Sequence, residues 1–353
     1  MRYFSSFTGV GGFDLAMPKD WECVGFSEID RYANMVLRQR FPDVKNYGDI
    51  NAIKWNEIPD FEVLFGGTPC QDLSLAGKRK GLVGERSGLF YKFVEALKAK
   101  KPKYFVWENV KGALSSSQGR DFIEVLNQFS EAGYSLWWQV LNAKYFGVPQ
   151  NRERIFIVGF RDRSPPEVFF EPEGSAEDNE LQGQPTANTL QARYTSLREG
   201  SYIIGGQQHT QDYAVQAGQS GRRFKNPGEP MFTLTGQDIH GVIIHNMQPR
   251  SPFRPSADRG GSGHLTKTDG TTYTIDTGNT NAVQLGNQIR RLTPKECERL
   301  MSWPDNWTRW GIDEKGNTIE ISDTQRYKMA GNGVVSNVVK WIIENVILRD
   351  SHA

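Results

Sequence analysis

Apolar residues in the first 160 positions of the chain follow two alternating patterns. Short runs of consecutive apolar residues, bounded by polar or turn-forming residues, predict buried strands. These runs cover residues 3–7, 23–26, 61–65, 104–107, 136–141 and 155–160. Between them, residues 30–40, 89–100 and 121–132 carry apolar side chains three and four positions apart, which indicates helices that pack one face on a sheet. The alternation predicts an α/β domain with a doubly wound, mostly parallel sheet.

The pattern changes between residues 161 and 288. This stretch holds 16 of the 36 glycines and four of the five histidines, and its apolar runs are short, which is typical of a small β domain. We therefore predict one domain from residues 1–160 and 289–353, and a second, smaller β-rich domain from residues 161–288.

Helical patterns return after residue 290. Thr293 precedes Pro294 and is predicted to cap a helix over residues 294–301. A last amphipathic helix is predicted over residues 336–348.

Composition and charge exclude several classes of protein. The 42 Lys and Arg residues balance 41 Asp and Glu residues, so net charge points to no particular partner. No apolar run approaches the roughly 18 residues of a membrane helix, and no signal-peptide core follows Met1, so we expect a cytoplasmic location. The three cysteines lie far apart without a Cys-x-x-Cys pair, which argues against both a disulfide framework and a metal site.

Cys70 is the first candidate for chemistry. It follows the third apolar run in the segment Gly-Gly-Thr-Pro-Cys-Gln, which presents a thiol at the end of a buried strand and predicts a nucleophile. No histidine precedes His209, so the arrangement of a cysteine hydrolase lacks its nearby base. The thiol is then expected to attack an atom that is already electrophilic. A buried structural cysteine is the alternative interpretation.

A glycine turn over residues 7–13 follows the first predicted strand. Glycines at this place let a nucleotide-like cofactor approach the backbone closely, although a purely structural turn is the competing interpretation. Glu28 ends the second run, where a carboxylate accepts hydrogen bonds from ribose hydroxyls. The spacing Gly-x-Gly-x-x-Gly is not met after Gly12, which disfavours a dinucleotide pyrophosphate.

Taken in order, these segments resemble the cytosine-5 DNA methyltransferases of bacterial or phage type. Nine blocks carry the resemblance, at residues 7–13, 28–30, 48–50, 69–71, 86–90, 108–110, 150–154, 291–294 and 331–334. The resemblance implies an S-adenosylmethionine-dependent methyltransferase fold, with double-stranded DNA as the partner and a monomeric enzyme.

The resemblance also implies which residues hold S-adenosylmethionine. Phe7 and Ile29 would flank its adenine, and Asp49 would accept from the exocyclic amine. The full implied set is Phe7, Gly9, Gly11, Gly12, Glu28, Ile29, Asp49, Ile50, Pro69, Leu89, Asn332 and Val334. Ile29 is smaller than the aromatic residue of some members, and Thr68 stands where phenylalanine is common.

The chemistry explains the catalytic residues. Carbon 5 of cytosine is a poor nucleophile, so the Cys70 thiolate must first add to carbon 6 and make an enamine that captures a methyl group. Glu108 ends the fourth run, where desolvation raises the pKa of a carboxyl group and favours a donor at ring nitrogen 3. Arg152 and Arg154 would share one face of an extended segment and hold the carbonyl oxygen of the base or nearby phosphates. Their spacing does not assign the two roles, and surface salt bridges are the competing interpretation.

Basic residues supply the predicted DNA contacts. The glycine-rich loop after Cys70 carries a basic cluster, and the resemblance implies that this loop closes over DNA once the cytosine leaves the duplex. Residues 161–288 would be the target-recognition domain. The named candidates are Lys78, Arg79, Lys80, Arg86, Arg222, Arg223 and Lys225.

Three other functions are compatible with parts of the pattern. An RNA cytosine-5 methyltransferase uses the same chemistry, but the Cys-Phe-Thr segment expected of that branch is absent. A catalytically silent DNA-binding homologue is disfavoured because Cys70, Glu108 and Arg154 are all present. A Rossmann oxidoreductase would leave Cys70 unexplained.

Overall fold

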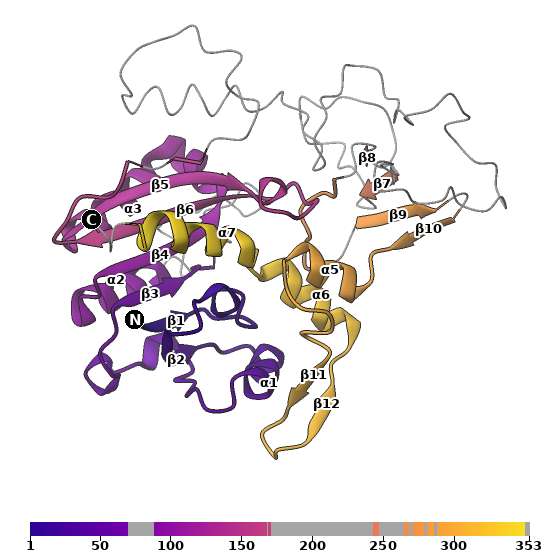
Figure 1. Cartoon of the computed structure of the whole chain (residues 1–353), viewed down its shortest axis with the longest axis horizontal. Coiled ribbons are helices and arrows are strands. Elements are labelled where there is room, and N and C mark those ends of the chain that lie inside the picture. Colours follow the sequence, from indigo (N-terminus) through magenta and orange to yellow (C-terminus); the bar gives the residue numbers. More distant parts are fainter. Residues whose placement is uncertain are drawn as a thin grey trace, which may run out of the picture. The chain divides into compact units, whose positions relative to one another are not determined.

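The computed structural model describes residues 1–69, 88–167, 169–170, 243–246, 265–267, 271–278, 281–285 and 288–349. The chain divides into two compact units. The first contains Met1–Val168, Thr274–Asn279 and Thr293–Ala353, and the second contains Phe169–Tyr273 and Thr280–Leu292 (Figure 1). The piece Thr274–Asn279 belongs to the first unit although it lies inside the region that composition sets apart.

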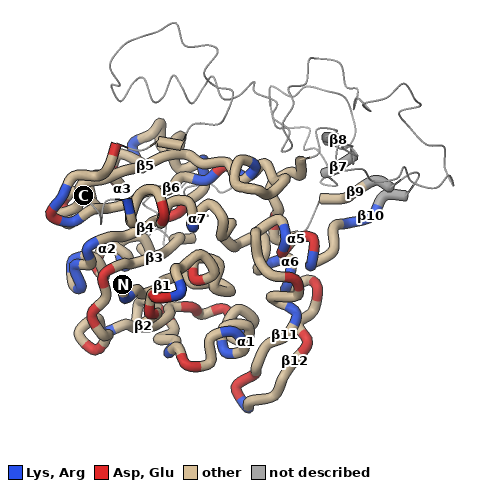
Figure 2. Tube along the Cα trace, viewed as in Figure 1, with Lys and Arg blue, Asp and Glu red and all other residues tan. Residues whose placement is uncertain are grey.

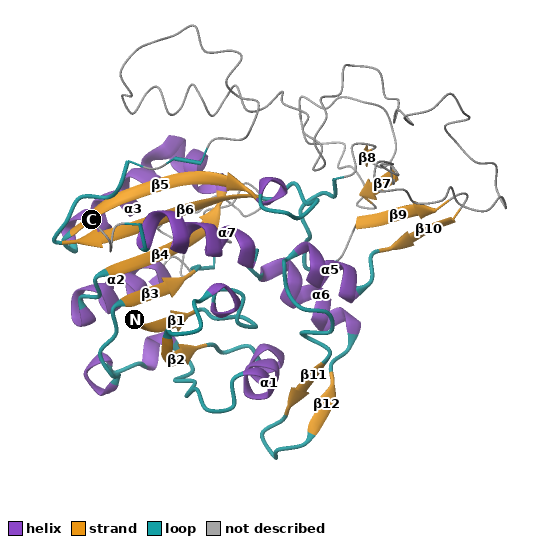
Figure 3. Cartoon of the chain, in the orientation of Figure 1, coloured by secondary structure: helices purple, strands orange, loops and turns teal. Residues whose placement is uncertain are grey.

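A six-stranded sheet forms the centre of the first unit (Figure 3). Its strands are β1 (Arg2–Ser6), β2 (Glu22–Ser27), β3 (Val63–Gly66), β4 (Tyr104–Val110), β5 (Tyr134–Asn142) and β6 (Glu153–Arg161). They lie in the order β2-β1-β3-β4-β6-β5. Neighbours among the first four are parallel, and β6 runs antiparallel to both β4 and β5. The prediction of a mixed α/β domain with a mostly parallel sheet is confirmed.

The predicted helices are also present. They are α1 (Arg31–Arg40), α2 (Gly88–Lys100), α3 (Arg120–Glu131), α5 (Pro294–Leu300) and α7 (Ser336–Ile342), which continues as a π-helical turn over Ile343–Ile347. A further helix, α6 (Asp323–Asn332), was not predicted. Short 3-10 turns are η1 (Asp14–Ala16), η2 (Ile50–Ala52), η3 (Trp55–Glu57), η6 (Lys111–Gly119) and η7 (Ala143–Tyr145). Thr293 caps α5 through a capping box with Glu296, as its sequence predicts. A hairpin of β11 (Trp310–Ile312) and β12 (Thr318–Glu320) was not predicted.

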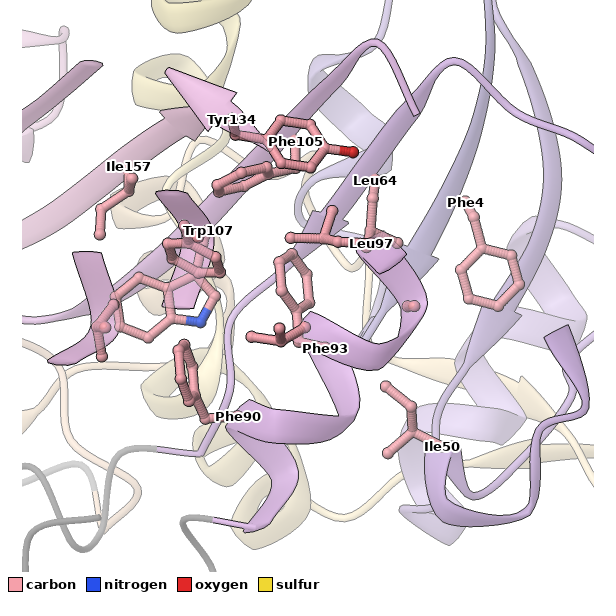
Figure 4. Close-up of a cluster of buried hydrophobic side chains, with 14 of the residues drawn as sticks. Phe4, Ile50, Leu64, Phe90, Phe93, Leu97, Phe105, Trp107, Tyr134 and Ile157 are labelled. Atoms are coloured by element: carbon pink, nitrogen blue, oxygen red, sulfur yellow. The ribbon is translucent and has the colours of Figure 1, made fainter. Parts of the chain in front are cut away.

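Both faces of the central sheet are buried. Leu64 and Trp107 point into an apolar cluster with Phe90 and Phe93 of α2 (Figure 4). The residues that alternate with them in β3 and in the first four positions of β4 are buried as well, so these apolar runs are covered on both faces. The carboxyl ends of the four parallel strands therefore meet at one edge, where ligands bind in open α/β sheets.

The second unit contains a four-stranded antiparallel sheet in the order β10-β9-β7-β8. Its strands are β7 (Ile243–Asn246), β8 (Leu265–Lys267), β9 (Asn281–Leu285) and β10 (Gln288–Arg291). Acidic and basic residues are interspersed along the trace of the first unit (Figure 2). Within the described ranges, no helix is long and apolar enough to cross a membrane, and no group of three or more His, Cys, Asp or Glu side chains is arranged to hold a metal ion.

Candidate active site

Glycine is needed for different reasons at the three glycine positions of the turn after β1. A Cβ atom on Gly11, which has φ +84°, would lie 2.7 Å from a ring carbon of Phe41. On Gly12 it would lie 3.0 Å from Cγ1 of Val334. Gly9, with φ +59°, has no heavy atom within 4 Å of such a position. Packing therefore requires Gly11 and Gly12, whereas Gly9 leaves open space where a ligand can approach the backbone.

The Glu28 carboxylate fastens this turn to the end of β2. Its Oε2 accepts from Gly9 N at 2.7 Å, and its Oε1 accepts from Ile29 N at 2.9 Å and Asp30 N at 2.7 Å. Burial raises the pKa of Glu28, and the backbone hydrogen bonds oppose that rise. Glu28 thus shapes the turn, a role that its sequence position did not reveal.

Asn46 was missed by the sequence analysis although it joins two predicted contact segments. Its Oδ1 accepts from Glu28 N at 3.1 Å and Gly48 N at 3.0 Å, and its Nδ2 donates to Glu28 O at 2.9 Å. Nδ2 also donates to Oδ1 of Asn34 at 2.6 Å. Asparagine is common in loops because its side chain often bonds to the nearby backbone, so nothing in the sequence indicated that Asn46 connects two segments.

Three of the implied cofactor residues, Phe7, Ile29 and Asp49, lie in the segments that follow β1 and β2. Phe7 is half-buried in a left-handed conformation with φ 52°, which a residue with a bulky side chain rarely adopts. Ile29 is 72% exposed, unusual for a large apolar side chain. Asp49 caps η2 by accepting from Asn51 N and Asn51 Nδ2, and both bonds use Oδ1, so Oδ2 keeps its capacity to accept.

The other implied cofactor residues divide between core and surface. Ile50 is buried in the apolar cluster and Leu89 packs against it, so both support the site from the core. Pro69 is exposed directly after the buried Thr68. Asn332 is exposed at the end of α6.

The C-terminal segment docks on the glycine turn. Val334 is buried, and its carbonyl oxygen accepts from Trp303 Nε1 at 3.3 Å. Ser336 Oγ donates to the carbonyl oxygen of Gly12 at 2.7 Å. Blocks from the two ends of the sequence are therefore joined at this edge of the sheet.

Glu108 lies within β4 rather than at its end, because pairing with β6 extends the strand to Val110. The Arg154 Nε atom lies 3.0 Å from Glu108 Oε1, and both side chains are 16% exposed. Burial raises the pKa of Glu108, and the charges of Arg154 and Arg152 oppose that rise. A Cβ on Gly67 would lie 2.9 Å from Glu108 Oε2, so the carboxyl group stands against the segment that leads to Cys70.

The spacing of Arg152 and Arg154 predicted a shared face, but the two side chains have different partners. The Arg152 side chain is buried, and Nη1 donates to Ile275 O at 3.2 Å. Nη2 donates to Gly331 O at 3.1 Å and to Gly333 O at 2.6 Å. Because β6 begins only at Glu153, the extended segment assumed for both arginines does not include Arg152. Arg152 therefore holds three carbonyl oxygens from two backbone segments, and Arg154 is the arginine that pairs with Glu108.

Several predicted residues lie outside the described part of the chain. They are Cys70, Lys78, Arg79, Lys80, Arg86, Arg222, Arg223 and Lys225. The described site thus combines a largely buried carboxyl and guanidinium pair on β4 and β6 with a glycine turn after β1, in one sheet. Such a site can donate a proton or hydrogen bond in a desolvated place beside a bound nucleotide-like ligand.

Known proteins are similar to this chain in sequence and fold. The family profile of the C-5 cytosine-specific DNA methylases matches residues 1–348. The type II methyltransferase M.Bsp6I of Bacillus sp. (strain RFL6) is 32% identical across 98% of this chain and 98% of its own length. M.HhaI of Haemophilus parahaemolyticus, also a type II methyltransferase, is 31% identical across 98% of this chain and 94% of its own.

A solved structure adds evidence for the fold. The Dnmt2 methyltransferase of S. pombe superposes with a TM-score of 0.57 at 16% identity, covering 100% of this chain and 99% of that one. Fold and sequence agree: the chain belongs to the C-5 cytosine-specific DNA methylase family and is a DNA (cytosine-5-)-methyltransferase.

Proposed function

We propose that this enzyme methylates carbon 5 of cytosine through a transient bond between Cys70 and carbon 6, with S-adenosylmethionine as the methyl donor. The observation that carries the mechanism is the placement of Glu108. Its carboxyl group is desolvated, paired with Arg154, and set against Gly67 in the segment that leads to Cys70. An acid and a nucleophile that act on one ring need this proximity.

The described residues fit S-adenosylmethionine. The exposed Ile29 and half-buried Phe7 offer apolar surface for an adenine ring, and Asp49 Oδ2 can accept from its amino group. The open space at Gly9 gives the amino acid part room beside the backbone. When bound, this cofactor supplies an electrophilic methyl group.

The protein residues then have distinct roles. Attack of the Cys70 thiolate on carbon 6 forms a carbon–sulfur bond and pushes electron density toward ring nitrogen 3, where Glu108 donates a hydrogen bond or proton. Arg154 holds the Glu108 carboxyl in place, and its remaining N–H groups can reach the carbonyl oxygen at carbon 2. Carbon 5 of the enamine takes the methyl group. Loss of the carbon 5 proton to water and departure of the thiolate restore the aromatic ring.

DNA recognition is assigned to the second unit and to the segment after Cys70. Residues 161–288 would act as a β-rich target-recognition domain, with Arg222, Arg223 and Lys225 reaching phosphates or base edges. The cluster Lys78, Arg79, Lys80 and Arg86 would hold the backbone around a flipped-out cytosine. A monomeric, cytoplasmic enzyme suits this arrangement, since one chain carries both catalytic and recognition parts.

A trapping assay tests the proposal. A duplex with 5-fluorocytosine at the target should give a covalent complex that survives denaturing electrophoresis, because fluorine cannot leave carbon 5 as the proton does. Mass spectrometry should find the modified base on Cys70, and Cys70→Ala should give no complex. A linkage to another side chain, or methyl label on an exocyclic nitrogen, would refute the mechanism. An RNA of the same sequence is the matched competitor.

A further inference from the structure

The segment directly before Cys70 is held from both faces of β4. Gly67 lies against the Glu108 carboxyl group, as described above. The next residue, Thr68, contacts side chains from the opposite face of the strand, Trp107 and Asn109. Because side chains alternate along a strand, Glu108 projects to one face and its two neighbours to the other.

The contacts of Thr68 are buried hydrogen bonds. Trp107 Nε1 donates to Thr68 Oγ1 at 3.1 Å. Asn109 Nδ2 lies 3.4 Å from the same hydroxyl and 3.3 Å from the Thr68 carbonyl oxygen. Asn109 is itself fixed, since its Oδ1 accepts from Val110 N at 2.8 Å. Exposed fractions are 0% for Trp107, 5% for Thr68 and 1% for Asn109, so water does not compete.

The indole N–H of Trp107 requires a hydrogen-bond acceptor at position 68. A fully buried indole N–H needs an acceptor, and Thr68 Oγ1 provides it here. Valine has the same shape as threonine but no acceptor, whereas serine keeps the hydroxyl. The hydrogen bond from Trp107 therefore holds the Thr68 side chain, and the hydrogen bond from Asn109 holds its backbone carbonyl oxygen.

Only Pro69 separates this fixed residue from Cys70. Proline holds its own φ near −65°, so little freedom enters the chain between Thr68 and the nucleophile. We infer that Thr68 and Trp107 form a positioning pair that sets how the Cys70 thiolate approaches the base. This inference rests on the proposed function of Cys70, and neither residue touches the substrate.

The test compares single-turnover methyl transfer and trapping rates at saturating DNA and cofactor. Thr68→Val should slow both rates by about tenfold to a hundredfold, because a nucleophile displaced by a fraction of an ångström loses that much. KM for DNA and for S-adenosylmethionine should stay within about twofold, since uniform binding is not affected. Thr68→Ser should restore the rate.

The partner variant tests the pair. Trp107→Phe removes the donor but keeps an aromatic ring in the core, and should slow the reaction in the same way. The double variant should be no slower than the slower single variant, because both changes remove one interaction. Should Thr68→Val fail to fold, Trp107→Phe and Thr68→Ser still give the comparison.

Tyr134→Phe is the matched control. Its buried hydroxyl donates to Pro102 O at 2.9 Å near the opposite edge of the sheet, so the variant loses a comparable hydrogen bond away from the site. It should lower Tm as Thr68→Val does but keep the wild-type rate. A wild-type rate for Thr68→Val, or equal slowing by Tyr134→Phe, overturns the positioning pair. Trapping by Cys70→Ala would instead refute the proposed function.

Discussion

Replacing Gly67 with alanine tests whether the position of the Glu108 carboxyl group controls the reaction. The new methyl group would lie 2.9 Å from Glu108 Oε2, whereas ordinary contacts begin at 3.4 Å. The carboxyl group must therefore move by about half an ångström. It is the far end of a flexible side chain, so it can move without displacing the backbone, but its 3.0 Å contact with Arg154 must change.

The expected cost falls on the rate rather than on stability. Gly67 does not have a left-handed φ, so alanine can adopt its backbone conformation. Alanine at such a position stabilises the folded protein by about 0.4–1 kcal/mol, because it lowers the conformational entropy of the unfolded chain, and this offsets part of the strain. We expect the free energy of unfolding to change by less than about 1 kcal/mol. Methyl transfer should slow by about tenfold to a hundredfold, as for other small displacements of catalytic groups.

Gly159→Ala is the matched control for strain alone. Its Cβ would lie 1.9 Å from a ring carbon of Phe105 in the middle of the sheet. This variant should lose about 1–3 kcal/mol or more of stability through overpacking. Urea unfolding and single-turnover methyl transfer separate the two outcomes. Gly67→Ala with full activity, or with a stability loss as large as that of Gly159→Ala, would refute the reasoning.

Three further predictions concern other buried or ligand-facing groups. Burial raises the pKa of Asp14 to about 6, so the stability that its protonated carboxyl group contributes is present below about pH 4 and is lost as pH rises through 6. Over pH 4 to 7.5, urea unfolding should show a loss of up to about 3 kcal/mol in the free energy of unfolding, and Asp14→Asn should abolish this pH dependence. Arg152→Met should cost at least about 3 kcal/mol because three carbonyl oxygens lose their donor, and an unchanged Tm would contradict the structural role. Asp49→Asn keeps the cap of η2 but turns the second oxygen into a donor, so calorimetry should show S-adenosylmethionine binding weaker by about tenfold at unchanged Tm, and equal affinity would exclude the proposed adenine contact.

The sequence predicted the sheet because burial on both faces makes each central strand a continuous apolar run. The same signal misplaced the end of β4. The apolar run stops at Trp107, but backbone pairing with β6 carries polar residues, Glu108 among them, further along the strand. Hydrogen-bonded pairing depends on the backbone of both strands, which a single apolar run does not reveal.

The sequence predicted which segments form the site but not which of their side chains contact one another. Arg152 and Arg154 look alike in the sequence, yet Arg152 donates to backbone carbonyl oxygens whereas Arg154 pairs with the Glu108 carboxyl group. Asn46 carries no motif, and its bridge depends on distances between two loops that only the folded chain defines. Residues joined across long separations in sequence are thus the part that pattern analysis misses.

The docking of the C-terminal segment on the glycine turn has a consequence for biosynthesis. Trp307 Nε1 donates to Val10 O and Ser336 Oγ donates to Gly12 O, across separations of 297 and 324 residues. A ribosome that adds 5–20 residues per second would take roughly 15 to 60 s to make these partners after the turn has been translated. During that interval the nascent polypeptide lacks the two hydrogen bonds that hold the glycine turn to the C-terminal segment. We therefore expect the enzyme to become active only late in translation. Chains made from a truncated messenger RNA should leave DNA unmethylated.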